Sequence, residues 1–352
     1  MAVKEGHKGV SGRERLALTV TALVPGVLGT LAALAGSAGT LAWLAPVTAL
    51  PVGLVLCRVW EGLGEKGLPL GLEEAFGKGL GKCLEALYLL WALFLMVERA
   101  DGYAQRLMTT TEGESVRWLY LGVGLALCLW LSRGGGTVLA RTGKLFFLAV
   151  AAVLALSLLL ALPGADWKNL WPPRTGDPAG LPMAAATALG LSGYGVFALC
   201  LPKREERKIQ AGVWTVWSCA VFSALILAVV GAFGPVLAAR MKEPFLLLLQ
   251  GVEVPGAFQR GEAALTAALA LADWALLALL TWGCKKLWSS LTGFAWGGGV
   301  LTAGAFLAAG LLPRWPLLQD GMAQMAVWGN LAFGMGIPFL GWILRGRKRK
   351  HI

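Results

Sequence analysis

Charged side chains are scarce in this sequence, because Asp, Glu, Lys and Arg together make up 14% of its 352 residues. An ordinary soluble domain contains about 25%. Hydrophobic residues make up 57% of the chain, which exceeds the share found in soluble domains. The composition therefore excludes an ordinary soluble protein and predicts a polytopic membrane protein.

Histidine is almost absent, and both copies, His7 and His351, lie in the terminal tails. No apolar segment thus carries an imidazole that could bind a metal ion or act as a base. The sequence also contains no Walker A, HExxH or GxSxG motif. The triple glycines in RGGGT and WGGGV lack the following lysine that a phosphate-binding loop needs. We expect no enzyme, which leaves a solute pathway or a ligand-sensing membrane subunit.

The 6 cysteines form no CxxC pair. Most lie near span ends that are predicted below to face the cytoplasm, where thiols stay reduced. We expect them to serve as small buried apolar residues. The sequence therefore predicts no disulfide, no metal site and no cofactor.

Apolar runs long enough to cross a hydrocarbon core of about 30 Å recur along the whole chain. A signal peptide is the alternative for the first run, because basic residues precede it and AGSAG offers small residues for cleavage. Its apolar region is too long for that, and further spans follow. The predicted spans are 16–35, 41–57, 83–104, 116–132, 142–162, 182–201, 210–233, 263–283, 287–312 and 321–344.

Most of the 31 lysines and arginines lie in the segments that alternate with an N-terminus on the cytoplasmic side. Positively charged loops resist translocation, so this bias predicts that both termini are cytoplasmic. The basic tail at 345–352 and the net charge of +11 are then explained by anionic lipid next to the cytoplasmic face. We expect contact with the lipid bilayer and no nucleic-acid binding.

Ten spans divide into two sets of five, at about 16–162 and 182–344, within one membrane domain that covers 1–352. Because five is odd, a second copy of the unit enters the membrane from the opposite side. The sequence therefore predicts an all-α integral membrane protein built as a 5+5 inverted repeat.

The first span of each half contains helix-breaking residues at the same position of the repeat. Span one reads TALVPGVLGT and span six reads GLSGYG. Interrupted spans in corresponding positions favour a solute site near the bilayer centre, because a broken helix offers free backbone groups. The alternative is that the glycines only allow close helix packing. The expected ligand-binding residues here are Val24, Pro25, Gly26, Gly29, Gly190, Ser192, Gly193, Tyr194 and Gly195.

The chain resembles the spore germination permeases, which are the B subunits of nutrient germinant receptors in the amino acid, polyamine and organocation transporter superfamily. The resemblance rests on SGRERL before span one, AFGKGLGKCLEALYLLWALFLMVERA through span three and LARTGKLFFLAV opening span five. DWKNLWPP, GLSGYGVFALCLP and VPGAFQRGEAALTAALALADW follow in the family's order. The resemblance implies a LeuT-type fold with broken helices 1 and 6. It also implies nutrient sensing in the inner membrane of the bacterial spore, with A and C subunits as partners.

Charged residues inside the spans are the remaining candidates. Asp273 lies at the centre of span eight, where an unpaired charge costs about 2.5–3.5 kcal/mol. We expect it to accept a proton or bind a ligand ammonium, and the alternative is a hydrogen-bonded structural aspartate. Lys144 opens span five, and the resemblance implies that a lysine on this helix can stand in for a sodium ion, which suggests proton rather than sodium coupling. Snorkelling to the interface is the alternative.

Glu98 and Arg99 cluster with Asp101 at the predicted outer end of span three. Consecutive residues do not face one another on a helix, so we expect no simple ion pair between Glu98 and Arg99. A gating contact with another span is one interpretation, and a solvated helix end is the other. Two functions remain: a receptor subunit that binds an amino-acid-like nutrient and triggers germination, and a proton-coupled secondary amino acid transporter.

Overall fold

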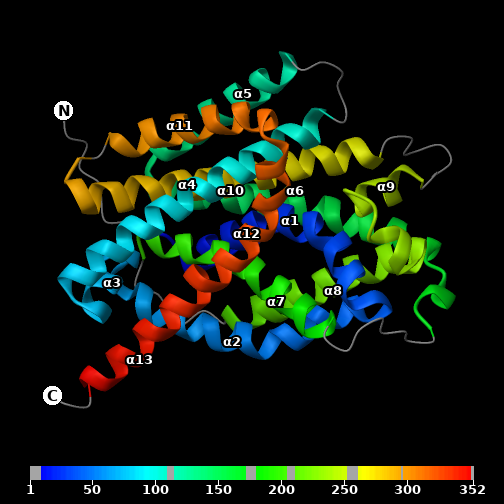
Figure 1. Ribbon diagram of the computed structural model, residues 1–352, viewed down its shortest axis with the longest axis horizontal. Helices are drawn as coiled ribbons and strands as arrows, with labels where there is room; N and C mark the ends of the chain where they lie inside the picture. The colour runs from blue at the N-terminus through cyan, green and yellow to red at the C-terminus, as the bar shows by residue number, and fades with distance from the viewer. Residues whose placement is uncertain are drawn as a thin grey trace.

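The computed structural model describes residues 9–108, 115–171, 180–203, 211–251, 261–294 and 296–349. These residues form helices and connecting turns, with one isolated β-bridge between Val10 and Lys203. Figure 1 shows the long helices lying side by side in one bundle, with α1 inside it. The longer α-helices of the described residues are α1 (Gly12–Ala38), α2 (Ala45–Leu63), α4 (Lys78–Met108), α5 (Ser115–Arg133), α6 (Gly135–Ala161), α7 (Gly180–Ser192), α8 (Ala211–Ala238), α10 (Gly261–Thr292), α11 (Gly297–Leu311), α12 (Pro316–Leu331) and α13 (Ile337–Arg349).

Within the described residues, 8 helical segments are long and apolar enough to cross a membrane. The first of them, Gly12–Lys66, has 55 residues, which at about 1.5 Å per residue is more than twice a bilayer core. It consists of α1, the 3₁₀ helix η1 (Gly39–Leu44), α2 and a second short 3₁₀ helix, η2 (Gly64–Lys66). Gly39 has a φ of 59° where α1 meets η1. The chain is therefore a multi-pass membrane protein, while the count of ten spans and the 5+5 repeat stay predictions.

The predicted ninth span, 287–312, is wrong at its start. Helix α10 continues to Thr292, and α11 begins at Gly297. Gly293 has a φ of 79°, a left-handed conformation that glycine adopts readily and that ends a helix. The turn therefore lies inside the run that hydropathy alone assigned to one span.

The predicted interruption of span one is also wrong, because α1 is helical from Gly12 to Ala38 with Pro25 inside it. Helix α1 packs against α6, α7, α8 and α10, so neighbours on several sides hold it. The Thr30 hydroxyl donates to the carbonyls of Gly26 and Val27, both at 3.0 Å. Such packing and side-chain bonds let a membrane helix keep its winding around a proline.

Span six was predicted to contain a broken helix, and the structure shows a change of helix type there instead of a break. Helix α7 ends at Ser192, and the chain continues as a 3₁₀ helix, η5 (Gly193–Cys200), before turning extended at Leu201. All residues of η5 are buried. The backbone therefore changes its hydrogen-bond pattern at the glycine-rich segment without unwinding.

The last span changes its winding too, because a π-helix, η7 (Ala332–Gly336), joins α12 to α13. Tyr88 Oη donates to the Phe333 carbonyl at 2.5 Å, and Trp60 Nε1 donates to the Gly334 carbonyl at 2.8 Å. These donors satisfy carbonyls that an irregular helix exposes inside a membrane protein.

A short helix, α3 (Leu68–Phe76), lies between the first two candidate spans and is tied to the C-terminal helix. Glu74 accepts from Lys66 Nζ at 2.6 Å and pairs with Arg345. The hydrogen bond from Lys66, together with Arg345, lowers the pKa of the Glu74 carboxyl. Arg345 also donates to the Gly62 carbonyl at the end of α2, at 2.5 Å, so one arginine links α2, α3 and α13.

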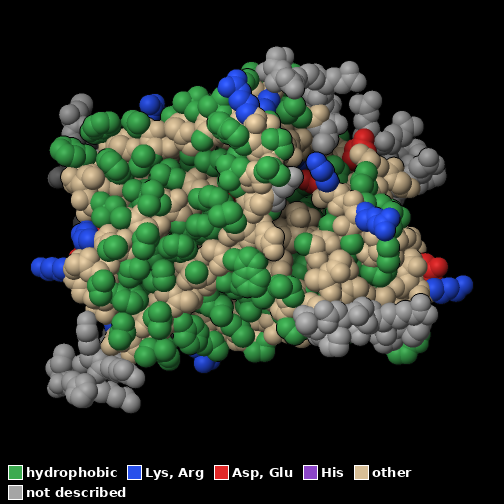
Figure 2. Space-filling model, in the orientation of Figure 1, with side chains coloured by type: hydrophobic (Ala, Val, Ile, Leu, Met, Phe, Trp, Pro, Cys, Tyr) green, Lys and Arg blue, Asp and Glu red, His purple; other side chains and the backbone are tan. Residues whose placement is uncertain are grey.

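The surface has the distribution expected of a membrane protein. Figure 2 shows a broad face of hydrophobic side chains, with most charged side chains towards its margins. It also shows a hollow right of centre where acidic and basic side chains meet.

Candidate functional site

Charged side chains on α4 form the core of the site, inside the protein. Glu98 and Arg99 are only 12% and 13% exposed. Arg99 Nη2 donates to Glu98 Oε1 at 2.6 Å, and Arg99 Nε donates to the other carboxylate oxygen. The expectation that these neighbours form no simple pair is wrong. Their long side chains bend towards each other because a buried charge without a partner costs several kcal/mol.

The alternative of a solvated helix end is wrong for the same pair. Helix α4 continues to Met108, one helical turn beyond the predicted end of span three, and both side chains are largely buried. Arg106 lies seven residues after Arg99, which places both arginines on one face of the helix. The charged cluster therefore lies within the helix and belongs to the protein interior.

Three elements meet at Arg99. Its guanidinium carbon lies 5.4 Å from the centroid of the Tyr194 ring at the start of η5, a cation–π arrangement. Gly26 of α1 faces the same point: a Cβ added there would lie 3.0 Å from Leu191, 3.8 Å from Tyr194 and 4.0 Å from Arg99 Nη1. The structure therefore brings Gly26, Tyr194 and the Glu98–Arg99 pair together.

Asp273 on α10 is 2% exposed and is held by Arg106 Nη1. Arg106 Nε also donates to Glu243 Oε1 at 3.0 Å, and Glu243 directly precedes the short helix α9 (Pro244–Gln250). The buried Asp273 thus has a cationic partner. This partner offsets the free-energy cost of placing a charged side chain in the middle of a membrane span. Arg106 connects α4, α10 and the entry to α9 through two ion pairs.

Asp101 organises a second buried group. It pairs with Arg117 of α5 and accepts from Gln105 Nε2 at 2.7 Å and from Gln319 Nε2 at 2.8 Å. Arg117 also donates to the Ala309 carbonyl of α11 at 2.7 Å. These contacts fix α4, α5, α11 and α12 to one another.

The glycines of the sixth span are used for packing. A Cβ on Gly190 would lie 2.8 Å from Val327, one on Gly193 would lie 2.6 Å from Asn330, and one on Gly195 would lie 2.6 Å from Trp60. The Ser192 hydroxyl donates to the Leu189 carbonyl at 2.6 Å. The geometry thus matches the packing interpretation for these glycines.

The remaining predicted residues are dispersed. Val24 is half-buried and Pro25 is buried in α1. Gly29 is exposed, and nothing lies within 4 Å of a Cβ placed on it. The Lys144 side chain is exposed on α6, as snorkelling to the interface would place it. Of the predicted residues, Gly26, Tyr194, Glu98, Arg99 and Asp273 form the candidate site.

Sequence reasoning missed Arg106, Arg117 and Glu243 as members of the charged interior. The seven-residue spacing of Arg99 and Arg106 was the available signal for the first. The partners of Asp273 and Asp101 come from distant segments, and no local pattern indicates such pairs. In the part of the chain that the structure describes, no group of three His, Cys, Asp or Glu residues could hold a metal ion.

Comparison with models of known protein families identifies the family of this chain. A model of the family described as spore germination protein matches residues 15–293. The chain belongs to the spore germination protein family. No curated protein matches the chain.

Solved structures show the fold. The chain is similar to two single-residue mutants of the Eremococcus coleocola manganese transporter, with TM-scores of 0.60 and 0.59 and 16% identity. The same transporter in complex with an aromatic bis-isothiourea substituted compound gives a TM-score of 0.58 and 17% identity. Each match covers 98% of this chain and 78% of the transporter. The expected all-helical, LeuT-type membrane fold is confirmed.

Proposed function

We propose that this chain is the membrane subunit of a spore germinant receptor, in which a small amino-acid-like nutrient binds beside Gly26, Tyr194 and the Glu98–Arg99 pair and triggers germination. The family and the transporter-type fold support a permease-type membrane protein. The observation that carries the ligand site is the meeting of the Pro25–Gly26 segment and the α7–η5 junction at a buried ion pair.

The chemistry of the pair fits a zwitterion. Arg99 uses Nε and Nη2 to hold Glu98, while Nη1 faces Gly26. A guanidinium nitrogen directed at a side-chain-free backbone position suits a ligand carboxylate. The Glu98 carboxylate suits a ligand ammonium, which would compete with Arg99 for its two oxygens. An α-amino acid carries both groups.

Signal transfer follows from the same contacts. A ligand that competes for Arg99 or Glu98 changes the contacts of α4 with η5 and α1. Arg106 lies on the same face of α4 and holds Asp273 and Glu243, so a shift of α4 reaches α10 and α9. We propose that A and C subunits receive this change in the inner membrane of the spore, with both termini of the chain cytoplasmic.

Gly26→Val tests the site, with Gly122→Val as its matched control. A valine at Gly26 meets Leu191, Tyr194 and Arg99, whereas nothing lies within 4 Å of a Cβ at Gly122 on α5. Both changes replace a helical glycine with the same residue. Spores carrying Gly26→Val are expected to need at least tenfold more amino acid for half-maximal germination, while Gly122→Val spores respond normally. An unchanged response of Gly26→Val spores, at normal protein levels, would refute this site.

A proton-coupled secondary amino acid transporter is the second candidate, and the shared fold with a transporter favours it. Here Asp273 and Glu98 would exchange protons during alternating access. Labelled amino acid uptake into proteoliposomes, driven by a pH gradient and independent of sodium, is the expected result for this function. Strict sodium dependence would exclude a role of Lys144 in place of sodium.

A further inference from the structure

A groove between α2 and α8 lies apart from the candidate nutrient site. It encloses about 530 Å³ and is lined by Leu54, Cys57, Arg58, Glu61, Ala211, Gly212, Val213, Val216 and Trp217. On α2 the lining residues recur at intervals of three and four positions, and on α8 they are the first three residues of the helix and the pair Val216 and Trp217 one turn later. Each helix therefore contributes one continuous stripe, and the two stripes face each other.

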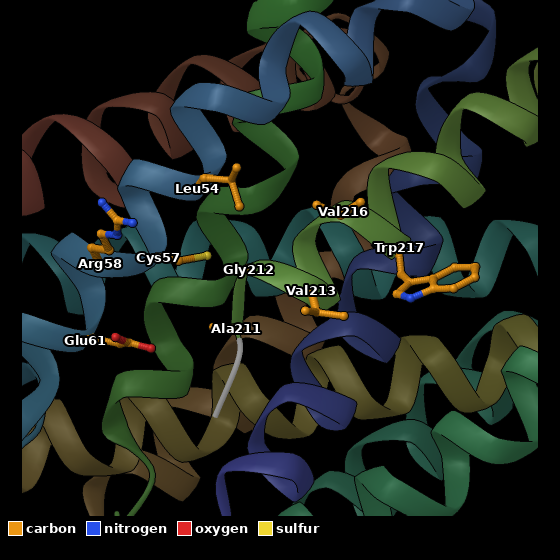
Figure 3. A pocket seen from close by; sticks show the side chains of 9 residues that line it. All are labelled: Leu54, Cys57, Arg58, Glu61, Ala211, Gly212, Val213, Val216 and Trp217. Atoms are coloured by element: carbon orange, nitrogen blue, oxygen red, sulfur yellow. The ribbon is translucent and has the colours of Figure 1, made fainter. Parts of the chain in front are cut away.

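Close contacts between the two helices form the floor of the groove. Cys57 Sγ and Thr215 Oγ1 are 3.2 Å apart. A Cβ on Gly212 would lie 3.3 Å from Leu54, and one on Gly53 would lie 3.5 Å from Thr215. Figure 3 shows Leu54 and Cys57 extending from α2 towards α8, with Val213 and Val216 opposite. Small residues of α2 and α8 allow the two helices to pack closely along the floor of the groove. The shape of the groove therefore follows from the packing of this helix pair.

The walls are apolar and open to the surface of the bundle. Val213, Val216 and Trp217 are 44%, 45% and 67% exposed. Both helices lie in candidate membrane spans. The open side of the groove therefore faces lipid, and its apolar walls suit an acyl chain.

One end of the groove is charged. Arg58 and Glu61 are exposed and lie one helical turn apart near the C-terminal end of α2, a separation of about 5 Å. Arg15 of α1 is close enough for the charge of Glu61 to act on it. The groove thus presents a cation and a carboxylate side by side where α2 reaches the membrane surface, and an apolar trough towards the membrane interior.

We propose that this groove binds a zwitterionic phospholipid with a primary ammonium headgroup, of the phosphatidylethanolamine class. Arg58 binds the lipid phosphate, because a guanidinium recognises phosphate through paired N–H donors. Glu61 accepts hydrogen bonds from the ammonium. Leu54, Val213 and Val216 contact the first part of an acyl chain. A choline headgroup has no N–H donor for Glu61, and a glycerol headgroup has no cation.

The test uses the full chain, purified in detergent and stripped of lipid, with phosphatidylethanolamine, phosphatidylcholine, phosphatidylglycerol or free phosphoethanolamine added. Phosphatidylethanolamine is expected to raise Tm most and to give a one-to-one adduct in native mass spectrometry. Arg58→Gln should remove most of this shift. Glu61→Gln should lower the preference over phosphatidylcholine at least threefold, and Val216→Trp should block the trough. Arg133→Gln, which changes an exposed arginine at the end of α5, is the matched control and should bind as the native chain does.

Equal binding of the three lipids, or an unchanged preference in Arg58→Gln and Glu61→Gln, would overturn the proposal. Binding of free phosphoethanolamine as tight as that of the lipid would show that the trough takes no part, and would overturn it as well. A dimer that Val216→Trp dissociates would assign the groove to a second copy of the chain instead.

Discussion

Arg106 shows how this protein accommodates charges inside the bilayer. Its guanidinium is 7% exposed and lies between the carboxylates of Asp273 and Glu243. Removing one member of a buried pair leaves the other charge without compensation, whereas removing both is far less costly. The stability of the interior therefore depends on matched pairs more than on any single charge.

A double-mutant cycle on Arg106 and Asp273 tests this dependence. Asp273→Asn and Arg106→Gln should each lower the free energy of unfolding by about 3 kcal/mol. The double variant should recover about 1–3 kcal/mol of the summed loss, because both charges of the Arg106–Asp273 pair are then removed, and the loss of the Glu243 contact is common to the single and double Arg106 variants. Denaturation of the purified chain followed by tryptophan fluorescence measures these values. Strict additivity would show that the two side chains do not interact.

Individual residues were predicted with mixed success, for physical reasons. Asp273 was identified because a charge in mid-span is costly, but its partner Arg106 lies 167 positions away in sequence and no local pattern marks it. For Glu98 and Arg99 the sequence left a solvated helix end and a gating contact both open, because hydropathy does not register a helix that continues as a polar segment inside a protein. Lys144 could not be assigned from sequence, since a lysine at a helix start suits both the interface and a cavity.

At the scale of elements, glycine decides how closely the irregular helices approach. A Cβ on Gly334 of η7 would lie 2.4 Å from the Cα of Gly193, and one on Gly193 would lie 2.6 Å from Asn330. The 3₁₀ helix and the π-helix therefore touch backbone to backbone. The glycine-rich motif was read from the sequence as a break, and the alternative of close packing describes its contacts better.

Gly193→Ala tests this packing, with Gly304→Ala as the control. The added methyl at Gly193 meets backbone atoms of Asn330, which cannot move aside, so stability should fall by about 1–3 kcal/mol. Nothing lies within 4 Å of a Cβ at Gly304 in α11, and alanine there should be neutral or stabilising by up to about 1 kcal/mol. Thermal unfolding of the two variants measures the difference. Equal Tm values would contradict the close approach of η5 and α12.

The ion pairs of Glu74, which link α3 to α13, predict a small dependence of the folding stability on pH. The pKa of Glu74 is lowered in the folded protein, first by the hydrogen bond from Lys66. A lowered pKa stabilises the fold above the unfolded value of about 4.3, and that contribution is lost as the pH falls through the folded pKa. Glu74→Gln should therefore lower stability at pH 7 by at most about 1 kcal/mol.

This effect is measured by comparing the Tm of Glu74→Gln and the native chain at pH 7 and at pH 3. The two curves should differ at pH 7 and converge at pH 3. A difference that is the same at both values would mean that the Glu74 charge does not contribute.

At the scale of the whole molecule, the fold class followed from composition, because 57% hydrophobic residues leave few alternatives to a membrane bundle. Helix boundaries followed less well. Gly293 ends α10 inside an apolar run, and Pro25 fails to interrupt α1 because neighbouring helices surround it. Both helix boundaries depend on packing between helices, and a hydropathy profile carries no information about that packing.

The same packing defines the central claim, that a nutrient binds where α1, η5 and α4 meet at Arg99. The most direct measurement is the thermal shift of the purified chain in lipid nanodiscs with each of the twenty standard amino acids. At least one amino acid should raise Tm in the native chain, and the shift should disappear in Arg99→Lys and remain in the control Arg133→Lys. The absence of a shift with every amino acid, or a shift that persists in Arg99→Lys, would contradict the account.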